Sequence, residues 1–295
     1  MNKIIFLLLL NFYLFNNIAT AQNNKQLDSL LLVLKNIKND TNKVNTLNLI
    51  SEILYDSNPD EAIKYAQKAN LLSNDIKYKK GIAKSLSIKG RIFQIKGDYN
   101  KSILFFEQAL KINIEINNKQ EIGETEKYIG IIYEKQRKYD KALTYYLKSL
   151  KNKEEINDRK GVASGYNNIA TIYLYQYNFI KAKEYYFKAL KIVEELNFKI
   201  GIATILSNIA GIYFQQDSVQ KAIIYNLRSL KVRNEIGNNY GIAQSLNNIG
   251  NCYSNKKIKM YDSALYYYKQ SKNLVQFLQI ITNIILIFCY KVKHI

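Results

Sequence analysis

The chain has 295 residues, a formal net charge of +19, one Pro, one His, no Trp and 25 Tyr. Since 47% of its residues are hydrophobic and 23% are charged, the composition excludes an intrinsically disordered chain. The near absence of proline leaves long helices uninterrupted. We therefore expect an all-α fold.

The first 21 residues have the pattern of a signal peptide. Lys3 supplies a positive charge, residues 4–15 are apolar, and residues 19–21 (Ala-Thr-Ala) form a small-x-small cleavage site. A transmembrane helix is the alternative, although asparagines interrupt the short apolar run. We expect a mature chain that begins at Gln22 and is exported to the periplasm of a Gram-negative-type bacterium.

The positive charge bears on the expected partner, because it attracts anionic molecules. Export makes nucleic acid an unexpected partner, which leaves acidic peptides, anionic glycans or a membrane surface. The alternative is that lysine is over-used throughout the chain and forms a solvated surface.

Two segments precede the main repeats. Residues 22–40 predict a capping helix with four leucines on one face, Leu27, Leu30, Leu31 and Leu34. Residues 41–80 predict a degenerate helix pair, with Pro59 in the first turn of its second helix, where the missing N–H is tolerated.

Residues 81–273 contain five units with a period of 40 residues. Each first half carries a small residue with an aromatic residue three positions later. The small residues are Gly90, Gly130, Ala170, Ala210 and Gly250. Each second half carries the series small, aromatic, small, which starts at Ser102, Ala142, Ala182, Ala222 and Ala264. Asn226 replaces the aromatic residue of the fourth unit. The spacing of three and four predicts a helical hairpin in which small residues let two backbones approach.

Polar residues separate these predicted helices. Within the hairpins stand Gly97-Asp98, Asp140, Asn178, Asp217-Ser218 and Asp262, as breakers or caps. Between the hairpins stand Asn117, Asn157, Asn197 and Gly237, which tolerate a left-handed backbone.

This spacing of small and aromatic residues resembles the tetratricopeptide repeat, in a form longer than the common unit of about 34 residues. The resemblance implies a right-handed superhelical solenoid of antiparallel helix pairs that binds a protein or an extended peptide in a concave groove. Exported arrays of this kind resemble the sensor regions of bacterial signalling proteins of the histidine-kinase type. The missing Trp and Asn226 depart from the family pattern.

Three asparagines two positions before the small residue, Asn168, Asn208 and Asn248, are the predicted ligand-binding ladder. Side-chain amides both donate and accept, so a column of them can pair with a peptide backbone. Related repeat proteins use asparagines at this place. The alternative is that these amides bond adjacent helices or reflect an Asn-rich chain.

Earlier units place Lys84, Arg91 and Lys127 on the same side, offset by Glu124 and Glu134, which predicts a partner with an acidic end. A solvated scatter of charges is the alternative.

Catalytic chemistry has no candidate residues. The only histidine, His294, is next to the C-terminus, which argues against His-based triads and HExxH metal sites. We expect no enzyme activity, no cofactor and no metal site. Cys252 is expected to be a small core residue.

The repeat pattern fails at Lys272, and an apolar tail follows at residues 274–295. A membrane anchor through residues 274–290, a capping helix and a shifted reading frame are the three interpretations. The sequence thus predicts a non-catalytic binding scaffold of the cell envelope, as the sensor part of a signal-transduction protein. A stand-alone structural adaptor of an envelope complex is the alternative.

Overall fold

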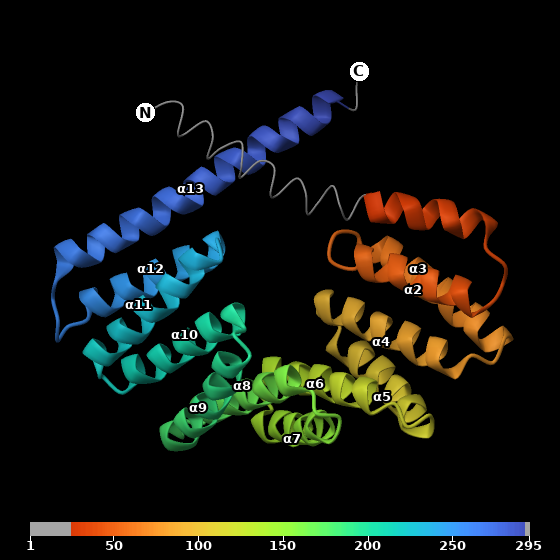
Figure 1. Cartoon of the computed structure of the whole chain (residues 1–295), viewed down its shortest axis with the longest axis horizontal. Helices are drawn as coiled ribbons and strands as arrows, with labels where there is room; N and C mark the ends of the chain where they lie inside the picture. The colour runs from red at the N-terminus through yellow and green to blue at the C-terminus, as the bar shows by residue number, and fades with distance from the viewer. Residues whose placement is uncertain (1–24, 293–295) are drawn as a thin grey trace. The chain divides into compact units, whose positions relative to one another are not determined.

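The computed structural model describes the backbone of residues 25–292 and the side chains of residues 25–279. These residues form helices joined by short turns, with no strand among them, which confirms the predicted all-α class (Figure 1). The chain divides into two compact units after Asn157. The predicted signal peptide lies outside the described residues.

In the N-terminal unit, a helix at residues 25–36 precedes three helix pairs. The pairs are α2 (Thr41–Leu54) with α3 (Pro59–Asp75), α4 (Lys79–Ile95) with α5 (Tyr99–Glu115), and α6 (Lys119–Lys135) with α7 (Tyr139–Glu155). Helices α3 and α5 each contact the first helix of the following pair as well as their own partners. The four leucines of residues 25–36 pack against the cluster around Ile50 and Leu54, so apolar contacts join this helix to the first pair.

The C-terminal unit continues the same order of paired helices. Its pairs are α8 (Arg159–Tyr175) with α9 (Phe179–Glu195), α10 (Lys199–Gln215) with α11 (Val219–Glu235), and α12 (Asn239–Ser254) with α13 (Tyr261–Val292). First helices begin two residues before the starts of the 40-residue units that the sequence indicates.

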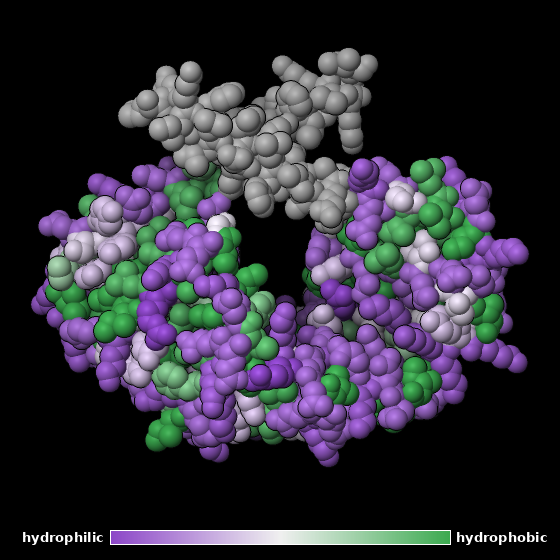
Figure 2. Space-filling view, viewed as in Figure 1, coloured by the Kyte–Doolittle hydropathy of each residue, from purple (hydrophilic) through white to green (hydrophobic). Residues whose placement is uncertain are grey.

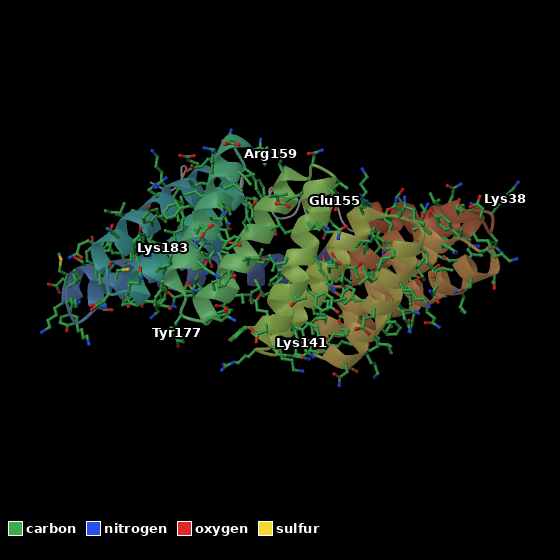
Figure 3. The ribbon with its side chains drawn as sticks, turned by 90° about the horizontal axis from the view of Figure 1, so that it is seen from below. Lys38, Lys141, Glu155, Arg159, Tyr177 and Lys183 are labelled. Atoms are coloured by element: carbon green, nitrogen blue, oxygen red, sulfur yellow. The ribbon has the colours of Figure 1, made fainter. Side chains whose placement is uncertain are left out.

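The turns confirm the expected left-handed residues. Asn117, Asn157 and Asn197 have φ of 52°, 55° and 48°, and Gly237 has φ of 65°. Arg137, Tyr177 and Asp217 take the same conformation within the hairpins, a conformation that favours glycine and asparagine. Tyr177 projects from the α8–α9 turn and is mostly exposed (Figure 3).

The expected capping role of Asp140 is wrong. Asp140 lies inside the first turn of α7, and Lys138 is the N-cap residue without a side-chain cap. Asp98 and Asn178 do cap their helices, because their side-chain oxygens accept from the backbone N–H of Lys101 and Lys181 at 3.1 Å.

In several hairpins, a ring of the second helix packs against a small residue of the first helix. A methyl group on Gly90 would lie 2.9 Å from the Phe106 ring, and one on Gly130 would lie 2.7 Å from the Tyr146 ring. A methyl group on Gly250 would lie 2.6 Å from the Tyr268 ring. These distances are below contact distance, so glycine is required at these three positions as the rings are placed.

In five hairpins, a second aromatic residue, which the sequence patterns did not single out, stacks on the ring of the first helix. The centroid separations are 5.3 to 5.6 Å for the pairs Phe93–Phe105, Tyr133–Tyr145, Tyr173–Tyr185, Tyr213–Tyr225 and Tyr253–Tyr267. A lysine ammonium lies 5.0 to 5.4 Å from the first ring in four pairs, from Lys101, Lys141, Lys181 and Lys221. Such contacts stabilise the outer side of each hairpin.

Helix α13 continues through the predicted apolar tail as far as Val292. Apolar residues reach the surface of the C-terminal unit (Figure 2), including Leu265, Val275 and Phe277, which are 50%, 46% and 41% exposed. Among the described residues, no helix is long and apolar enough to cross a membrane. Cys289 lies where no side chains are described.

Replacing Tyr146 with alanine is expected to lower the free energy of unfolding by about 3–5 kcal/mol, because the ring is fully buried and leaves a cavity. Urea denaturation followed by circular dichroism measures the loss. Tyr240→Ala, at an exposed position, is the control and is expected to stay within about 0.5 kcal/mol of the parent. Equal midpoints for the parent and Tyr146→Ala would contradict the packing described above.

Arg137→Gly is expected to raise the free energy of unfolding by about 1 kcal/mol, since it relieves a left-handed backbone at φ of 59°. The opposite change, Gly97→Ala at φ of 78°, is expected to lower it by a similar amount. Thermal melting of both variants checks the sign of each effect.

Candidate functional site

A cavity of about 390 Å³ opens in the N-terminal unit between α2, α4, α5 and α6. Its lining combines amides and charges, from Asn45, Asn48, Leu49, Glu52, Lys80, Lys84, Asn113, Asn118 and Glu121. A smaller cavity of about 130 Å³ shares Glu52, Lys84 and Glu121 with it. The predicted basic residues Lys84 and Arg91 therefore lie together beside a polar hollow.

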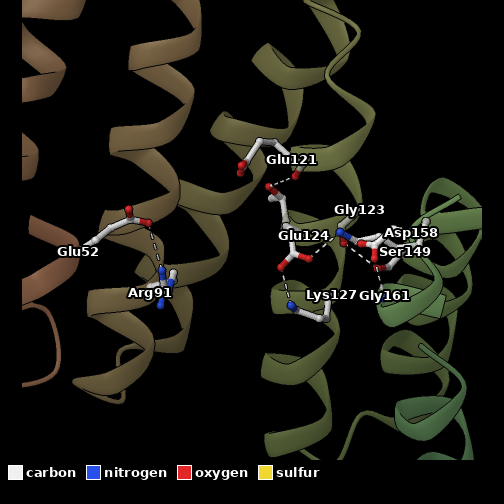
Figure 4. A network of polar contacts seen from close by, with 11 residues as sticks. Glu52, Arg91, Glu121, Gly123, Glu124, Lys127, Ser149, Asp158 and Gly161 are labelled. Atoms are coloured by element: carbon white, nitrogen blue, oxygen red, sulfur yellow. Dashed lines mark hydrogen bonds and ion pairs between the residues drawn. The ribbon is translucent and has the colours of Figure 1, made fainter. Parts of the chain in front are cut away.

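These basic residues have carboxylate partners. The Glu52 carboxylate lies 2.8 Å from Lys84 Nζ. It also lies 3.5 Å from Arg91 Nη1 (Figure 4). The Arg91 guanidinium also lies 4.2 Å from the Tyr55 ring centroid and 5.4 Å from that of Tyr128. These contacts hold the Arg91 side chain in place, and the Glu52 carboxylate balances its charge.

Glu124 is the carboxylate partner of Lys127, the third basic residue of the predicted site. Its carboxylate lies 2.5 Å from Lys127 Nζ and 2.7 Å from the Nζ of Lys153, whose side chain is 2% exposed. Burial alone would raise the pKa of Glu124, but the two ammonium groups outweigh it and lower the pKa below its ordinary value. The site is therefore a set of ion pairs and not an unpaired basic patch.

Several buried polar groups of this unit have no hydrogen-bond partner among the described residues. Those beside the cavities are both side-chain amide atoms of Asn48, the hydroxyl of Ser87 and Nδ2 of Asn113. All three residues line the two cavities. A buried polar group without a partner costs about 1–3 kcal/mol, so these atoms are positioned for an additional donor or acceptor.

In the C-terminal unit, the predicted ladder is partly joined by its own hydrogen bonds. Asn208 Nδ2 donates to Asn167 Oδ1 at 2.9 Å, and Asn167 Nδ2 approaches Asn168 Oδ1 at 3.4 Å. The amides of two neighbouring hairpins are therefore connected, as the alternative interpretation expected. The side-chain amide of Asn248 has no hydrogen-bond partner among the described residues, so it is free to bind a ligand at this end of the ladder.

The sequence patterns did not single out Asn48 and Ser87. Ser87, Lys127, Asn167, Ser207 and Asn247 follow one another at the 40-residue period, one residue before the predicted ladder. Ser207, like Ser87, has a buried hydroxyl without a partner among the described residues. The 40-residue period predicts which residues are equivalent, but only their burial in the structure shows which of them lack a hydrogen-bond partner.

Metal binding and nucleophilic catalysis would each need particular side chains. Within residues 25–279, no group of three His, Cys, Asp or Glu side chains is placed to hold a metal ion. Cys252 is buried, as expected, and burial raises the pKa of its thiol to about 11. A thiol with this pKa is a poor nucleophile at neutral pH.

The fold defines the class as an all-α array of helical hairpins. A tetratricopeptide repeat model matches residues 121–195 and 201–276, which make up half of the 295 residues, and a second such model matches residues 83–113. The chain belongs to the tetratricopeptide repeat family. It matches no curated protein in sequence.

Solved structures share the fold. The chain is similar to BtubC (BKLC) from P. vanneervenii, with a TM-score of 0.64 and 20% identity over 78% of this chain and 92% of that one. It is similar to a signal-transduction ATPase with a tetratricopeptide repeat sensor from Pyrococcus horikoshii, with a TM-score of 0.70 and 14% identity, over 91% of this chain but 44% of that one. It is also similar to the Rap conjugation gene regulator of plasmid pLS20, solved with the Phr* peptide, with a TM-score of 0.60 and 14% identity over 88% and 76%.

Glu124→Gln is expected to lower the free energy of unfolding by about 1–3 kcal/mol at pH 7, because it removes a charged acceptor from Lys127 and Lys153. The native pKa of Glu124 lies below its unfolded value, so its contribution is complete above the unfolded pKa. That contribution is lost as the pH falls through the native pKa. Urea titrations of parent and variant from pH 7 to acid check that their difference disappears; a difference that does not change with pH would contradict the ion pairing.

Proposed function

We propose that the chain is a non-catalytic scaffold that binds extended peptide or protein segments along the first helices of each unit. The observation that carries this proposal is the set of buried hydrogen-bonding groups that have no partner among the described residues. Asn48, Ser87 and Ser207 supply such groups, and Asn248 adds an open amide.

A peptide backbone matches these groups chemically. Each peptide unit offers one donor and one acceptor, and a side-chain amide offers both in return. Because the native fold already carries the cost of the unpaired atoms, a partner that pairs them gains this energy on binding. The groups lie on helices, which hold them in place and reduce the ordering cost of binding.

The similar structures support a binding role. The pLS20 Rap regulator is described in complex with a peptide, and the Pyrococcus horikoshii protein is described as carrying its repeats as a sensor. We extend this to the chain as the sensor part of a signal-transduction protein. Export from the cytoplasm is part of the same proposal and depends on residues 1–21. The paired charges around Glu52 and Glu124 favour recognition of backbone over recognition of a purely acidic segment.

Panning of a random-peptide phage library on the purified chain tests the function. We expect extended peptides to be enriched. We expect Asn168→Ala with Asn208→Ala to weaken binding of the selected peptides at least about tenfold, because the ladder loses two of its three side-chain amides. Isothermal titration calorimetry measures the affinity, and circular dichroism checks that the double variant folds.

Asn234→Ala with Asn273→Ala is the matched control, since both asparagines are exposed and lie on second helices. Peptides that bind the parent and the ladder variant equally would remove the ladder from the site. Failure to enrich any peptide would reject peptide binding.

A further inference from the structure

The hairpin α10–α11 differs from its two neighbouring hairpins at two positions that face each other. Asn226 on α11 replaces the ring that Tyr186 and Tyr268 supply in the neighbouring hairpins. Gly211 on α10 stands where Thr171 and Asn251 stand in those hairpins, 40 residues away on either side.

In the neighbouring hairpins the two positions are bonded to each other. The Tyr186 hydroxyl lies 2.9 Å from Thr171 Oγ1, and the Tyr268 hydroxyl donates to Asn251 Oδ1 at 2.6 Å. A phenol ring and its hydroxyl partner are therefore both missing from α10–α11. A methyl group on Gly211 would find no atom within 4 Å.

The missing groups leave a cavity of about 110 Å³. Ala210, Gly211, Phe214 and Cys252 form its apolar wall, and Asn226, Asn248 and Asn251 provide its amides. Asn226 is 3% exposed, and its Oδ1 has no hydrogen-bond partner among the described residues. Its Nδ2 approaches only the Cys252 sulfur, at 3.9 Å, which is a weak acceptor.

We propose that this cavity receives an aromatic side chain of the bound partner, with a tyrosine hydroxyl donating to Asn226 Oδ1. The proposal deepens the peptide-binding function proposed above and rests on it, since Asn248 belongs both to the ladder and to the cavity wall. A partner whose backbone pairs with Asn248 has a side-chain pocket directly beside it.

Three features favour a phenol ring as the occupant. The same framework already holds tyrosine rings at the equivalent place in the neighbouring hairpins. The volume is of the order that holds one aromatic ring, since a dry cavity of about 150 Å³ binds benzene. The unpaired Asn226 oxygen needs a donor, which a phenol has and an aliphatic side chain lacks.

The experiment uses p-cresol, which is the tyrosine side chain as a free molecule, and toluene, which lacks the hydroxyl. Both are titrated into the purified chain while the side-chain amide resonances of Asn226, Asn248 and Asn251 are followed by NMR. We expect saturable shifts of these resonances with p-cresol and about fivefold weaker binding of toluene, since one hydrogen bond is lost.

The matched variant is Gly211→Thr with Asn226→Tyr, which rebuilds the bonded arrangement of α8–α9 within α10–α11. We expect it to melt at a higher temperature than the parent and to bind p-cresol at least about tenfold more weakly. Gly211→Leu is a second variant that obstructs the cavity and leaves Asn226 in place. It keeps the test decisive if the double variant does not fold.

Absence of p-cresol shifts in the parent, or equal shifts in the parent and both variants, would overturn the proposal. A cavity that holds water and excludes p-cresol would also overturn it. Library peptides that bind the parent while p-cresol does not would reject the pocket and leave the scaffold function standing. Saturable p-cresol binding without any enriched peptide would support the aromatic pocket and reject the peptide groove.

Discussion

The small residues at which the two helices of a hairpin approach each other are the constraint on which the other contacts of the hairpins depend. They set how closely the helices approach, and a methyl group on Gly130 would already collide with Tyr146. Close approach brings the second aromatic residue, such as Tyr145, onto the ring of Tyr133. It also brings the serines of the second helices within reach of backbone carbonyls of the first, as with Ser149 and Gly123 at 2.7 Å. Because each hairpin buries its faces mainly against its neighbours, one altered hairpin changes the structure locally.

The α10–α11 hairpin shows what happens when the ring is absent. The backbone keeps its hairpin form, since Ala222 and Ser229 are still fully buried and Ser229 still donates to the Ala203 carbonyl at 2.7 Å. The missing ring volume therefore remains as a cavity and does not collapse the pair. An array of near-identical hairpins can thus acquire a pocket by losing a ring and the side chain that faces it, with little cost to the neighbouring hairpins.

Much of the fold can be predicted from the sequence, because the 40-residue period repeats a local pattern of small, aromatic and turn residues. Helix pairing, the seated rings and the left-handed asparagines such as Asn117 all depend on residues close in sequence. The candidate site is less predictable. Whether Asn48 is unpaired, and whether Asn208 bonds to Asn167, depends on distances between helices that no local pattern fixes. The Asp140 error has the same origin, since a shift of two residues separates an N-cap from the first turn.

The distribution of charge also constrains how a partner is recognised. Basic residues outnumber acidic ones by 43 to 24, yet many of the acids are used within the fold. A lysine or arginine at the start of a first helix pairs with a glutamate at the end of its partner helix in four hairpins, at Lys79–Glu115, Lys119–Glu155, Arg159–Glu195 and Lys199–Glu235. Exposed pairs of this kind add little stability. They hold these charged side chains at the helix ends and not at the asparagine ladder. Beside the N-terminal cavities, Glu52 and Glu124 balance the bases in the same way. In the proposed function, the excess positive charge therefore acts on a partner at long range, and close recognition is assigned to amides, hydroxyls and cavity shape.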